Sequence, residues 1–249
     1  MQMALIGFDE FHMGSSMANP EADGLTALAG LLEKNDHKLE FINTPLDALD
    51  KLPWDVIIIP FPKNQFTEDE MTSLQSHLEN GKSILLLAEW GDLFGHVDFL
   101  NELTTPCGIE IQKDRVTDHE EHVTQKVELA GVVLGEESIP HFVRVQNFAD
   151  HPITQGISEL IYFSGCSLRV SEGASALAST SASSFGDIDL DSILDEGEIQ
   201  GELPIAAVSE MNGRLVVVGD SNIAANGYIE QGDNLLFVQQ AIEWLSFNI

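Results

Sequence analysis

Short apolar runs and helical patterns alternate along the first hundred residues. Four apolar runs end abruptly at polar residues or proline and predict buried strands, at Met3–Phe8, Leu39–Ile42, Asp55–Pro60 and Ser83–Ala88. Apolar residues at helical spacing lie between or after them, over Glu21–Lys34, Thr67–Leu78 and Leu93–Leu103. The second of these helices opens with a predicted capping box, with Thr67 at the N-cap and Glu70 at N3. This alternation predicts an α/β fold with a doubly wound, mostly parallel sheet.

The remainder of the chain is less regular and contains more strands than helices. The predicted strands are Val127–Val133, Phe142–Val145, Tyr162–Val170, Ala174–Ser179, Pro204–Val208 and Arg214–Gly219. Two polar segments predict loops, at Asp114–Gln125 and in an acidic insert at about Phe185–Gly201. A final helix begins at Asp233 or Asn234. No repeat or linker interrupts the chain, so we expect residues 1–249 to form a single domain.

The segment Ser83–Asp92 carries the clearest functional signal. Its apolar run stops at Glu89, Trp90 and Gly91, and a helical pattern follows, which is typical of a strand that enters a sharp turn and a helix. In α/β folds such turns lie at the carboxyl ends of parallel strands, where ligands bind. Polar and aromatic side chains that follow other strands should lie at the same edge: Asp9, His12, Phe61, Asp220 and Ser221.

Acidic residues dominate the charge of the chain. Asp and Glu number 41 against 11 Lys and Arg, which gives a formal net charge of −30. Such a surface repels nucleic-acid phosphates and anionic membranes, so neither is an expected partner. It also destabilises the compact state by self-repulsion, which salt near about 1 M largely screens. A halophilic source is therefore one hypothesis, and an ordinary acidic protein is the other.

Cysteine content and hydropathy restrict the cellular setting. The two cysteines, Cys107 and Cys166, are too few for a disulfide framework or a zinc set, and two free thiols are expected. The start of the chain shows no basic segment leading into an apolar stretch, and no run of about 18 apolar residues occurs. We therefore expect a cytoplasmic protein without a signal peptide and without direct membrane insertion.

Four stretches of sequence together resemble a known family. They are IGFDEFHMG at 6–14, DVIIIPFP at 55–62 with TEDEM behind it, ADHPITQGI at 149–157, and the segment from Arg214 to Leu245. They are similar to the GIFT-type domains, named for gliding-motility and intraflagellar-transport proteins, within the class I glutamine-amidotransferase-like superfamily. The resemblance spans nearly the whole chain and implies a flavodoxin-like, three-layer α/β/α sandwich. GIFT-type domains generally lack the catalytic nucleophile and are thought to bind sugars or other proteins.

The elbow departs from the pattern of the active amidotransferases. Their turn reads Gly-x-Cys-x-Gly, its Cys is the nucleophile, and a His and a Glu are supplied later in the chain. Here the matching segment is 87–91, Leu-Ala-Glu-Trp-Gly, so only the last glycine is kept and Glu89 stands in place of the thiol. A carboxylate cannot form the thioester that glutamine hydrolysis needs, and neither Cys107 nor Cys166 follows a strand in an elbow pattern. Glutaminase activity is therefore not expected.

Two explanations stay open for the polar residues at this edge. Glu89 and His12 would act as an acid–base pair if their side chains lay within about 3 Å or shared a water. Alternatively, Glu89 bonds loop amides and His12 orders its own loop. Trp90 and Phe61 beside Asp9 and Glu89 would suit a sugar, because aromatic faces stack on sugars and carboxylates bind hydroxyls. Plain packing under the elbow is the other explanation for Trp90.

The acidic insert spaces its carboxylates like the ligands of a calcium-binding loop. Positions 1, 3, 5, 9 and 12 of an EF-hand-like loop are filled by Asp187, Asp189, Asp191, Asp195 and Glu198. Position 6 should be glycine but is Ser192, and no clear helical pattern flanks the segment. Such spacing arises readily by chance in an acidic chain, so the set is only a weak metal candidate. No cofactor is expected.

The sequence thus favours a non-catalytic domain that binds a ligand or acts as a scaffold. Its partner would be a small molecule such as a carbohydrate, or a protein. The alternative is a hydrolase that uses Glu89 and His12 at the same edge. A third hypothesis is a structural subunit that pairs with a homologue and exposes an apolar patch of more than a few hundred Å². Homo-oligomerisation is also left open.

Overall fold

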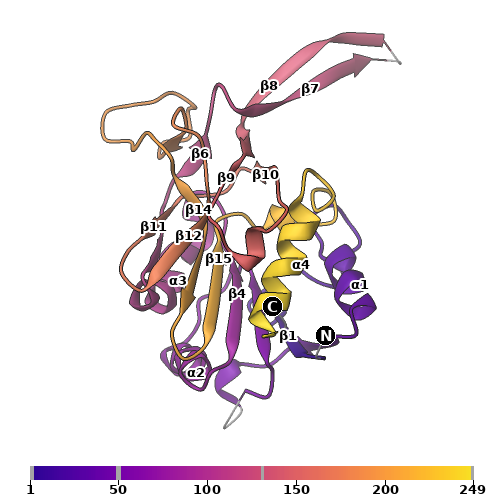
Figure 1. Ribbon diagram of the computed structural model, residues 1–249, viewed down its shortest axis with the longest axis vertical. Helices are drawn as coiled ribbons and strands as arrows, with labels where there is room; N and C mark the ends of the chain where they lie inside the picture. Colours follow the sequence, from indigo (N-terminus) through magenta and orange to yellow (C-terminus); the bar gives the residue numbers. More distant parts are fainter. Residues whose placement is uncertain (1–2, 49–51, 130–131, 248–249) are drawn as a thin grey trace.

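A central sheet of eight strands organises the chain, and helices lie against it (Figure 1). The computed structural model describes residues 3–48, 52–129 and 132–247. Its strands are β1 (Leu5–Asp9), β2 (Lys38–Ile42), β3 (Val56–Pro60), β4 (Ser83–Leu87), β5 (Ile109–Ile111), β6 (Arg115–Thr117), β7 (His122–Leu129), β8 (Val132–Val145), β9 (Asn147–Phe148), β10 (Leu160–Phe163), β11 (Leu168–Val170), β12 (Ala174–Ser179), β13 (Phe185–Asp187), β14 (Pro204–Glu210) and β15 (Arg214–Val218). Its helices are α1 (Thr26–Lys34), α2 (Glu68–Glu79), α3 (His96–Thr104) and α4 (Asn234–Leu245), with short 3₁₀ helices η1 (Leu46–Ala48), η2 (Leu93–Gly95), η3 (Thr105–Cys107), η4 (Pro152–Thr154) and η5 (Asn222–Ala224).

The sheet is mixed rather than mostly parallel. Its strand order is β2-β1-β3-β4-β15-β14-β12-β9. Neighbouring strands from β2 to β15 pair in parallel, whereas β14, β12 and β9 join through antiparallel pairings. The α/β prediction is confirmed, but the parallel arrangement holds for only one part of the sheet. The change of direction follows from the short turn at 211–213, which folds β14 and β15 into a hairpin.

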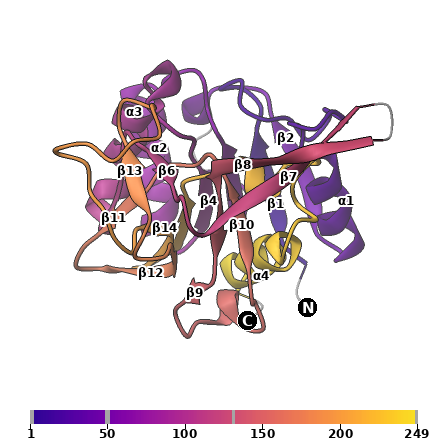
Figure 2. The same ribbon diagram turned by 90° about the horizontal axis from the view of Figure 1, so that it is seen from above.

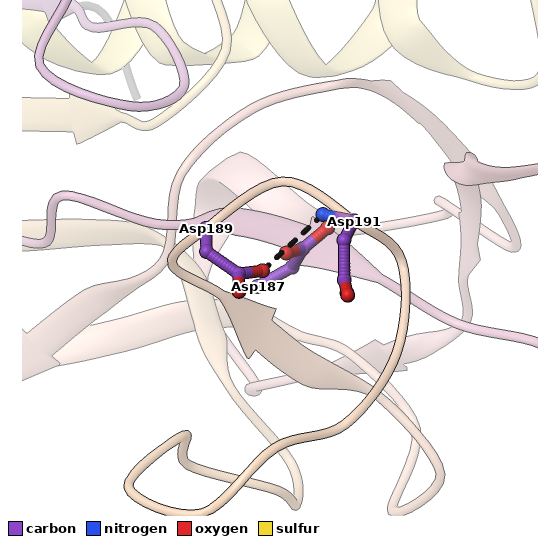
Figure 3. Close-up of side chains that lie close together, drawn as sticks. All are labelled: Asp187, Asp189 and Asp191. Atoms are coloured by element: carbon purple, nitrogen blue, oxygen red, sulfur yellow. Dashed lines mark hydrogen bonds between the residues drawn. The ribbon is translucent and has the colours of Figure 1, made fainter.

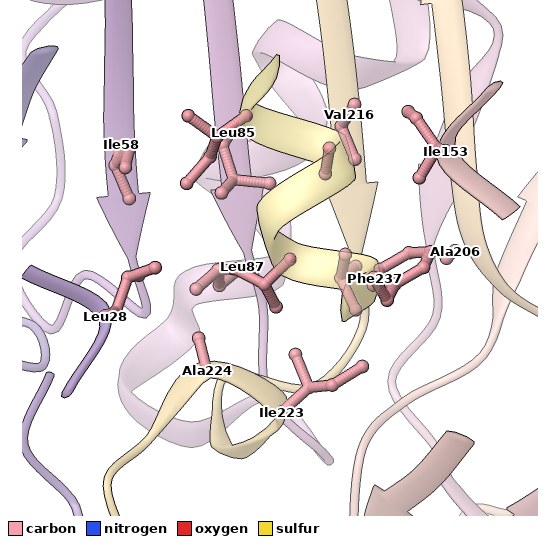
Figure 4. Close-up of a cluster of buried hydrophobic side chains, with 14 of the residues drawn as sticks. Leu28, Ile58, Leu85, Leu87, Ile153, Ala206, Val216, Ile223, Ala224 and Phe237 are labelled. Carbon is pink, nitrogen blue, oxygen red and sulfur yellow. The ribbon is translucent and has the colours of Figure 1, made fainter. Parts of the chain in front are cut away.

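Successive strand residues alternate between two apolar clusters, because side chains on a strand point to opposite faces of the sheet. One cluster joins Ile58 of β3 to α4 through Phe237 and also includes residues of α1 (Figure 4). The other joins Ile57 to α2 through Leu74 and to α3 through Leu100. All five of these side chains are completely buried. The helices therefore pack on both faces of the sheet, with α1 and α4 in one cluster and α2 and α3 in the other.

A long hairpin of β7 and β8 projects away from the central sheet (Figures 1 and 2). The loop predicted at Asp114–Gln125 is wrong, because β6 and the start of β7 lie within it. β6 pairs with β13, which belongs to the acidic insert, and polar segments so far apart in sequence give no local signal of pairing. The predicted strand Val127–Val133 falls in the hairpin, except for residues 130–131, which lie outside the described residues.

Other local signals have mixed outcomes. The capping box is confirmed, since the Thr67 hydroxyl accepts from the Glu70 amide and the Glu70 carboxylate accepts from the Thr67 amide. The strand predicted at Tyr162–Val170 is divided into β10 and β11, because Ser164 adopts a left-handed backbone with φ of 65°. Within the described residues, no helix has the length and apolar character to cross a membrane.

Candidate functional site

The predicted elbow follows β4 at the carboxyl edge of the sheet. The backbone leaves β4 after Leu87, and Gly91 takes a left-handed φ of 62° that favours glycine. The Gly91 amide donates to the Asp114 carbonyl at 2.8 Å. Gly95, also left-handed, then precedes α3. The strand, turn and helix lie where the sequence predicted them, and the turn carries Glu89 at its start.

The Glu89 carboxylate is buried and engaged in hydrogen bonds. Only 5% of the residue is exposed. One oxygen accepts from the Ser221 hydroxyl at 2.9 Å and from the Asn222 side-chain amide at 3.2 Å, and the other accepts from the Trp90 backbone amide at 3.1 Å. Glu89 therefore links the elbow to the loop after β15 instead of presenting a reactive group to solvent.

Asp220 lies beside Glu89 and is completely buried. Its two oxygens accept from the backbone amides of Phe163 at 2.6 Å and Asn222 at 2.8 Å. Burial raises the pKa of Asp220 to about 7. Burial, and then the charge of Asp220, raise the pKa of Glu89 well above its ordinary value. Two carboxyl groups so close in a dry environment do not both ionise at neutral pH, so at least one proton stays with the pair.

Neither cysteine supplies an activated thiol to this carboxyl pair. Cys166 is completely buried, and its thiol donates to the Gly219 carbonyl at 3.4 Å. Burial raises its pKa well above the ordinary value, and burial also raises the pKa of Cys107. Both cysteines are free, as the sequence predicts. A neutral, buried thiol is unreactive, so neither replaces the missing elbow cysteine.

His12 forms a separate buried cluster with Asp9 and Glu70. Its Nδ1 lies 2.8 Å from an Asp9 oxygen, its Nε2 lies 3.3 Å from a Glu70 oxygen, and its ring packs on Phe66 at a centroid distance of 3.8 Å. Burial lowers the pKa of His12, but the hydrogen bond and charge of Asp9, helped by Glu70, outweigh burial and raise it. The Asp9 carboxylate also accepts from the Phe11 and His12 amides, so the cluster orders its own loop.

The structure does not bring His12 and Glu89 into contact. His12 bonds to Asp9 and faces Glu70, whereas Glu89 bonds to Ser221, Asn222 and its own turn. β3 separates β1 from β4 in the sheet, so their ends lie about 10 Å apart at the usual strand spacing. Sequence reasoning assigned Glu70 to a helix cap only, and it missed Asn222 because an amide two residues beyond Asp220 gives no signal by itself.

The two predicted aromatic ligand contacts differ in their surroundings. Phe61 is nearly buried and left-handed, with φ of 51°, and its ring lies 5.1 Å from the His96 ring and 6.2 Å from Phe94. Trp90 is half-buried, and the Arg115 guanidinium lies 6.0 Å from its ring centroid. Phe61 therefore supports its neighbour Phe94, and Trp90 packs between the elbow and β6.

Exposed apolar side chains gather on the loops of this same edge. We define the carboxyl-edge patch as Phe11, Met13, Lys63 and Phe94. Phe11, Met13 and Phe94 are exposed by 40%, 64% and 66%. The loops are tied together, since the Lys63 amide donates to the His12 carbonyl at 2.9 Å and the Lys63 ammonium lies 6.0 Å from the Phe94 ring. Sequence reasoning missed this patch because apolar residues inside loops follow no helical or strand period.

The weak metal candidates are brought together only in part. Ligand oxygens of Asp187, Asp189 and Asp191 lie within 4.8 Å of one another (Figure 3). Glu198 instead accepts from the Ile188 and Asp195 amides and so closes the loop. Asp187 already forms an ion pair with Arg115 at 2.7 Å. A cation at this position would have to compete with that guanidinium.

Comparison with known proteins places the chain in a family. The sequence belongs to the family described as a domain of unknown function (DUF4350), which matches residues 17–242. Among curated proteins no sequence relative matches this chain. The solved structures described below are 14–20% identical to this chain, and at such identities they show a similar fold only.

Three solved structures illustrate that fold. The mmIFT52 N-terminal domain has a TM-score of 0.73 at 20% identity, with 97% of both chains covered. A ThuA-like protein from Bacteroides uniformis has a TM-score of 0.54 at 15% identity, with 97% of this chain and 89% of that chain covered. A cytoplasmic protein from Salmonella typhimurium has a TM-score of 0.58 at 14% identity, with 98% of both chains covered. The chain therefore shares its fold with the mmIFT52 N-terminal domain and with a ThuA-like protein.

Proposed function

We propose that this chain is a non-catalytic domain that binds a protein partner through its carboxyl-edge patch. The observation that carries the proposal is the state of Glu89, which stands in place of the amidotransferase nucleophile. It is buried and accepts three hydrogen bonds from neighbouring groups. Breaking such bonds in a dry site costs about 1–3 kcal/mol for each group left unpaired. The elbow therefore has a structural role, in which Glu89 holds the loop after β15 by hydrogen bonds.

Burial of the other candidate residues favours a protein over a carbohydrate. Asp9, His12, Asp220 and Ser221 are all nearly inaccessible to solvent. Sugar hydroxyls need open polar groups, and these groups are already hydrogen-bonded within the protein. Three side chains exposed at this edge are Phe11, Met13 and Phe94, and aromatic residues and methionine are enriched at protein interfaces.

Backbone conformation adds a second line of support. Met13 and Phe94 are exposed and left-handed, with φ of 56° and 61°. A left-handed backbone costs a residue other than glycine about 1–2 kcal/mol, and such strain clusters at functional sites. Neither side chain gains burial in this structure that offsets the cost. Contact with a partner would supply that burial.

The family resemblance supports the same conclusion. GIFT-type domains are thought to bind sugars or proteins, and the similarity in fold to the mmIFT52 N-terminal domain favours a protein-partner role. A carbohydrate remains the second ligand class to test. Glu89 and His12 do not form the acid–base contact that the hydrolase alternative requires, so the structure offers it no support. A second copy of the chain would be one form of protein partner.

The wider assignments belong to the same proposal. We take residues 1–249 as one domain of the amidotransferase-like superfamily with a three-layer α/β/α architecture. The two apolar clusters, which divide the helices between them, support three layers. We also propose a cytoplasmic setting and a high-salt habitat, the latter supported by the net charge of −30.

Replacing Phe94 by aspartate is expected to reduce partner capture about tenfold, because the loss of one buried anchor costs about 1.4 kcal/mol or more. The measurement is chemical crosslinking of the tagged protein in its source cells, followed by quantitative mass spectrometry. Phe41→Asp is the matched control, since Phe41 lies on β2 outside the patch and is 50% exposed.

Equal recovery of every crosslinked protein from wild type and Phe94→Asp would refute docking at the patch. A sugar that raises the melting temperature of wild type, but not of Glu89→Ala, would instead favour the carbohydrate alternative. Loss of the same partners from Phe41→Asp would indicate general damage to the surface and would also count against a patch-specific contact.

The habitat proposal predicts a stabilising effect of salt. Raising KCl from about 0.1 M to about 1 M shortens the Debye length from about 10 Å to about 3 Å, which screens repulsion among the acidic side chains. The melting temperature should therefore rise with KCl in differential scanning calorimetry. A melting temperature that stays level or falls over this range would contradict the high-salt hypothesis.

A further inference from the structure

A cavity of about 240 Å³ lies at the amino-terminal edge of the sheet, away from the elbow. It is bounded by the last turn of α2, by the segment from α3 to η3, and by the turn between β14 and β15. α2 and this turn lie at the end of the molecule opposite the β7–β8 hairpin (Figure 1). The cavity therefore shares no residue with the carboxyl-edge patch and requires a separate explanation.

The floor of the cavity is apolar and well formed. Leu103 and Leu215 are almost completely buried, and Cys107 is 9% exposed. For comparison, an engineered cavity of about 150 Å³ lined by Leu, Ile and Phe stays dry and binds benzene. The present cavity is larger, so it has room for one aromatic ring with a short substituent.

The rim of the cavity is polar and negatively charged. Gln75 and Asn212 offer side-chain amides, and Glu79 offers a carboxylate. The rim also lies at the carboxyl terminus of α2, which carries a partial negative charge of roughly half a unit, although the carbonyls of Ser76, His77 and Leu78 already accept from following backbone amides. Lys and Arg do not occur among the residues that line the cavity. A carboxylate or phosphate ligand would therefore be repelled, whereas an amine would be attracted.

We propose that this amino-edge cavity binds a small molecule with one apolar ring or short chain and a positively charged amine. The apolar body would rest on Leu103, Cys107 and Leu215. The amine would lie at the rim near Glu79, Gln75 and Asn212. The proposal does not depend on the protein partner at the opposite edge, and either one can fail without the other.

Cys107 makes the proposal measurable, because this residue lines the cavity and its thiol can be labelled. Labelling with N-ethylmaleimide is followed by mass spectrometry at about pH 8.5, since burial raises the pKa of this thiol and slows its reaction at neutral pH. Cys166 is completely buried and serves as the internal control for unfolding. The probes are benzylamine, benzyl alcohol and benzoate, which share a ring and differ in charge.

Benzylamine at about ten times its Kd leaves about a tenth of the sites free, so labelling of Cys107 should slow about tenfold. Benzyl alcohol should protect less, and benzoate should not protect. If none of the three probes slowed the labelling of Cys107, the proposal of a binding site in this cavity would be wrong. Protection by benzoate equal to that by benzylamine would overturn the ligand class.

A pair of variants on α2 tests the location. Gln75→Trp places an indole at the rim and should abolish benzylamine binding in ligand-observed NMR. Thr72→Trp adds the same ring at an exposed position on the same helix and should leave binding unchanged. Binding that survives in Gln75→Trp would place the amine site elsewhere and contradict the proposal. If Gln75→Trp does not fold, the labelling of wild-type Cys107 still decides the question.

Discussion

Replacing Asp220 by alanine is expected to lower the free energy of unfolding by about 3 kcal/mol. The Asp220 carboxylate accepts hydrogen bonds from the backbone amides of Phe163 and Asn222, and the residue is completely buried. Alanine leaves both donors without a partner where water cannot replace it, and each buried unpaired donor costs about 1–3 kcal/mol. Relief of the repulsion with Glu89 offsets part of this loss at neutral pH.

The measurement is thermal or urea unfolding at about pH 5, below the raised pKa values of the pair, where relief of repulsion is small. For a chain of this length, about 3 kcal/mol corresponds to a fall in melting temperature of about 6–12 °C. Asp233→Ala is the matched control. Asp233 accepts three hydrogen bonds, one more than the two described for Asp220, from the amides of Ser158 and Glu159 and the Ser158 hydroxyl, but it is partly exposed. Equal losses in the two variants would show that burial of Asp220 is not the cause.

The Glu89→Gln variant is expected to lose less stability than wild type as the pH rises from about 5 to about 8. The two curves of unfolding free energy against pH should therefore diverge over this range, because each unit by which folding raises the Glu89 pKa makes wild-type stability fall by about 1.4 kcal/mol. Glutamine keeps the shape of the side chain and cannot ionise. It also removes the negative charge that faces Asp220.

The sign follows from proton uptake. Glu89 and Asp220 have raised pKa values in the folded state, so between their ordinary values near 4 and about 7 the folded protein holds more protons than the unfolded chain. Their contribution to stability is therefore complete below about pH 4 and is lost as the pH rises through the folded pKa values. His12 also has a raised pKa, but it titrates in both proteins, and its effect cancels in the comparison.

Urea unfolding of both proteins at several pH values measures this difference. Glu40→Gln is the control, because Glu40 is close to Lys38 and its pKa is lowered, so it titrates below the pH range used. A donor-to-donor clash between the new amide and the Trp90 amide would shift stability equally at each pH, which is why the slope is the quantity compared. Parallel curves for wild type and Glu89→Gln would contradict the assignment of a raised pKa to Glu89.

Much of the fold could be predicted because the buried strands carry their own signal. The apolar segments at β1, β3 and β4 are completely or almost completely buried, so their composition differs sharply from that of the loops. The elbow could be located for the same reason, as the point where an apolar run meets Glu89. The capping box at Thr67 is also a local signal, and the structure confirms it.

The rest of the site depends on contacts between distant segments. Glu89 meets Ser221 across the pairing of β4 with β15, and this pairing cannot be read from either segment alone. The sequence placed Glu89 and His12 at one edge but could not show that β3 lies between their strands. Likewise, Phe94 is exposed on a loop where its backbone is left-handed, and no pattern of apolar residues indicates either property.

The position of β15 between β4 and β14 has a consequence for how the chain is made. β4 ends at Leu87, whereas its neighbour on one side, β15, begins only at Arg214. A ribosome adding about 5–20 residues per second needs about 6–25 s to synthesise the intervening chain. Throughout that interval the completely apolar edge from Ile84 to Leu87 lacks its partner, and unpaired apolar edges are where nascent chains aggregate. We therefore expect this strand edge to contribute to the demand for chaperones during synthesis.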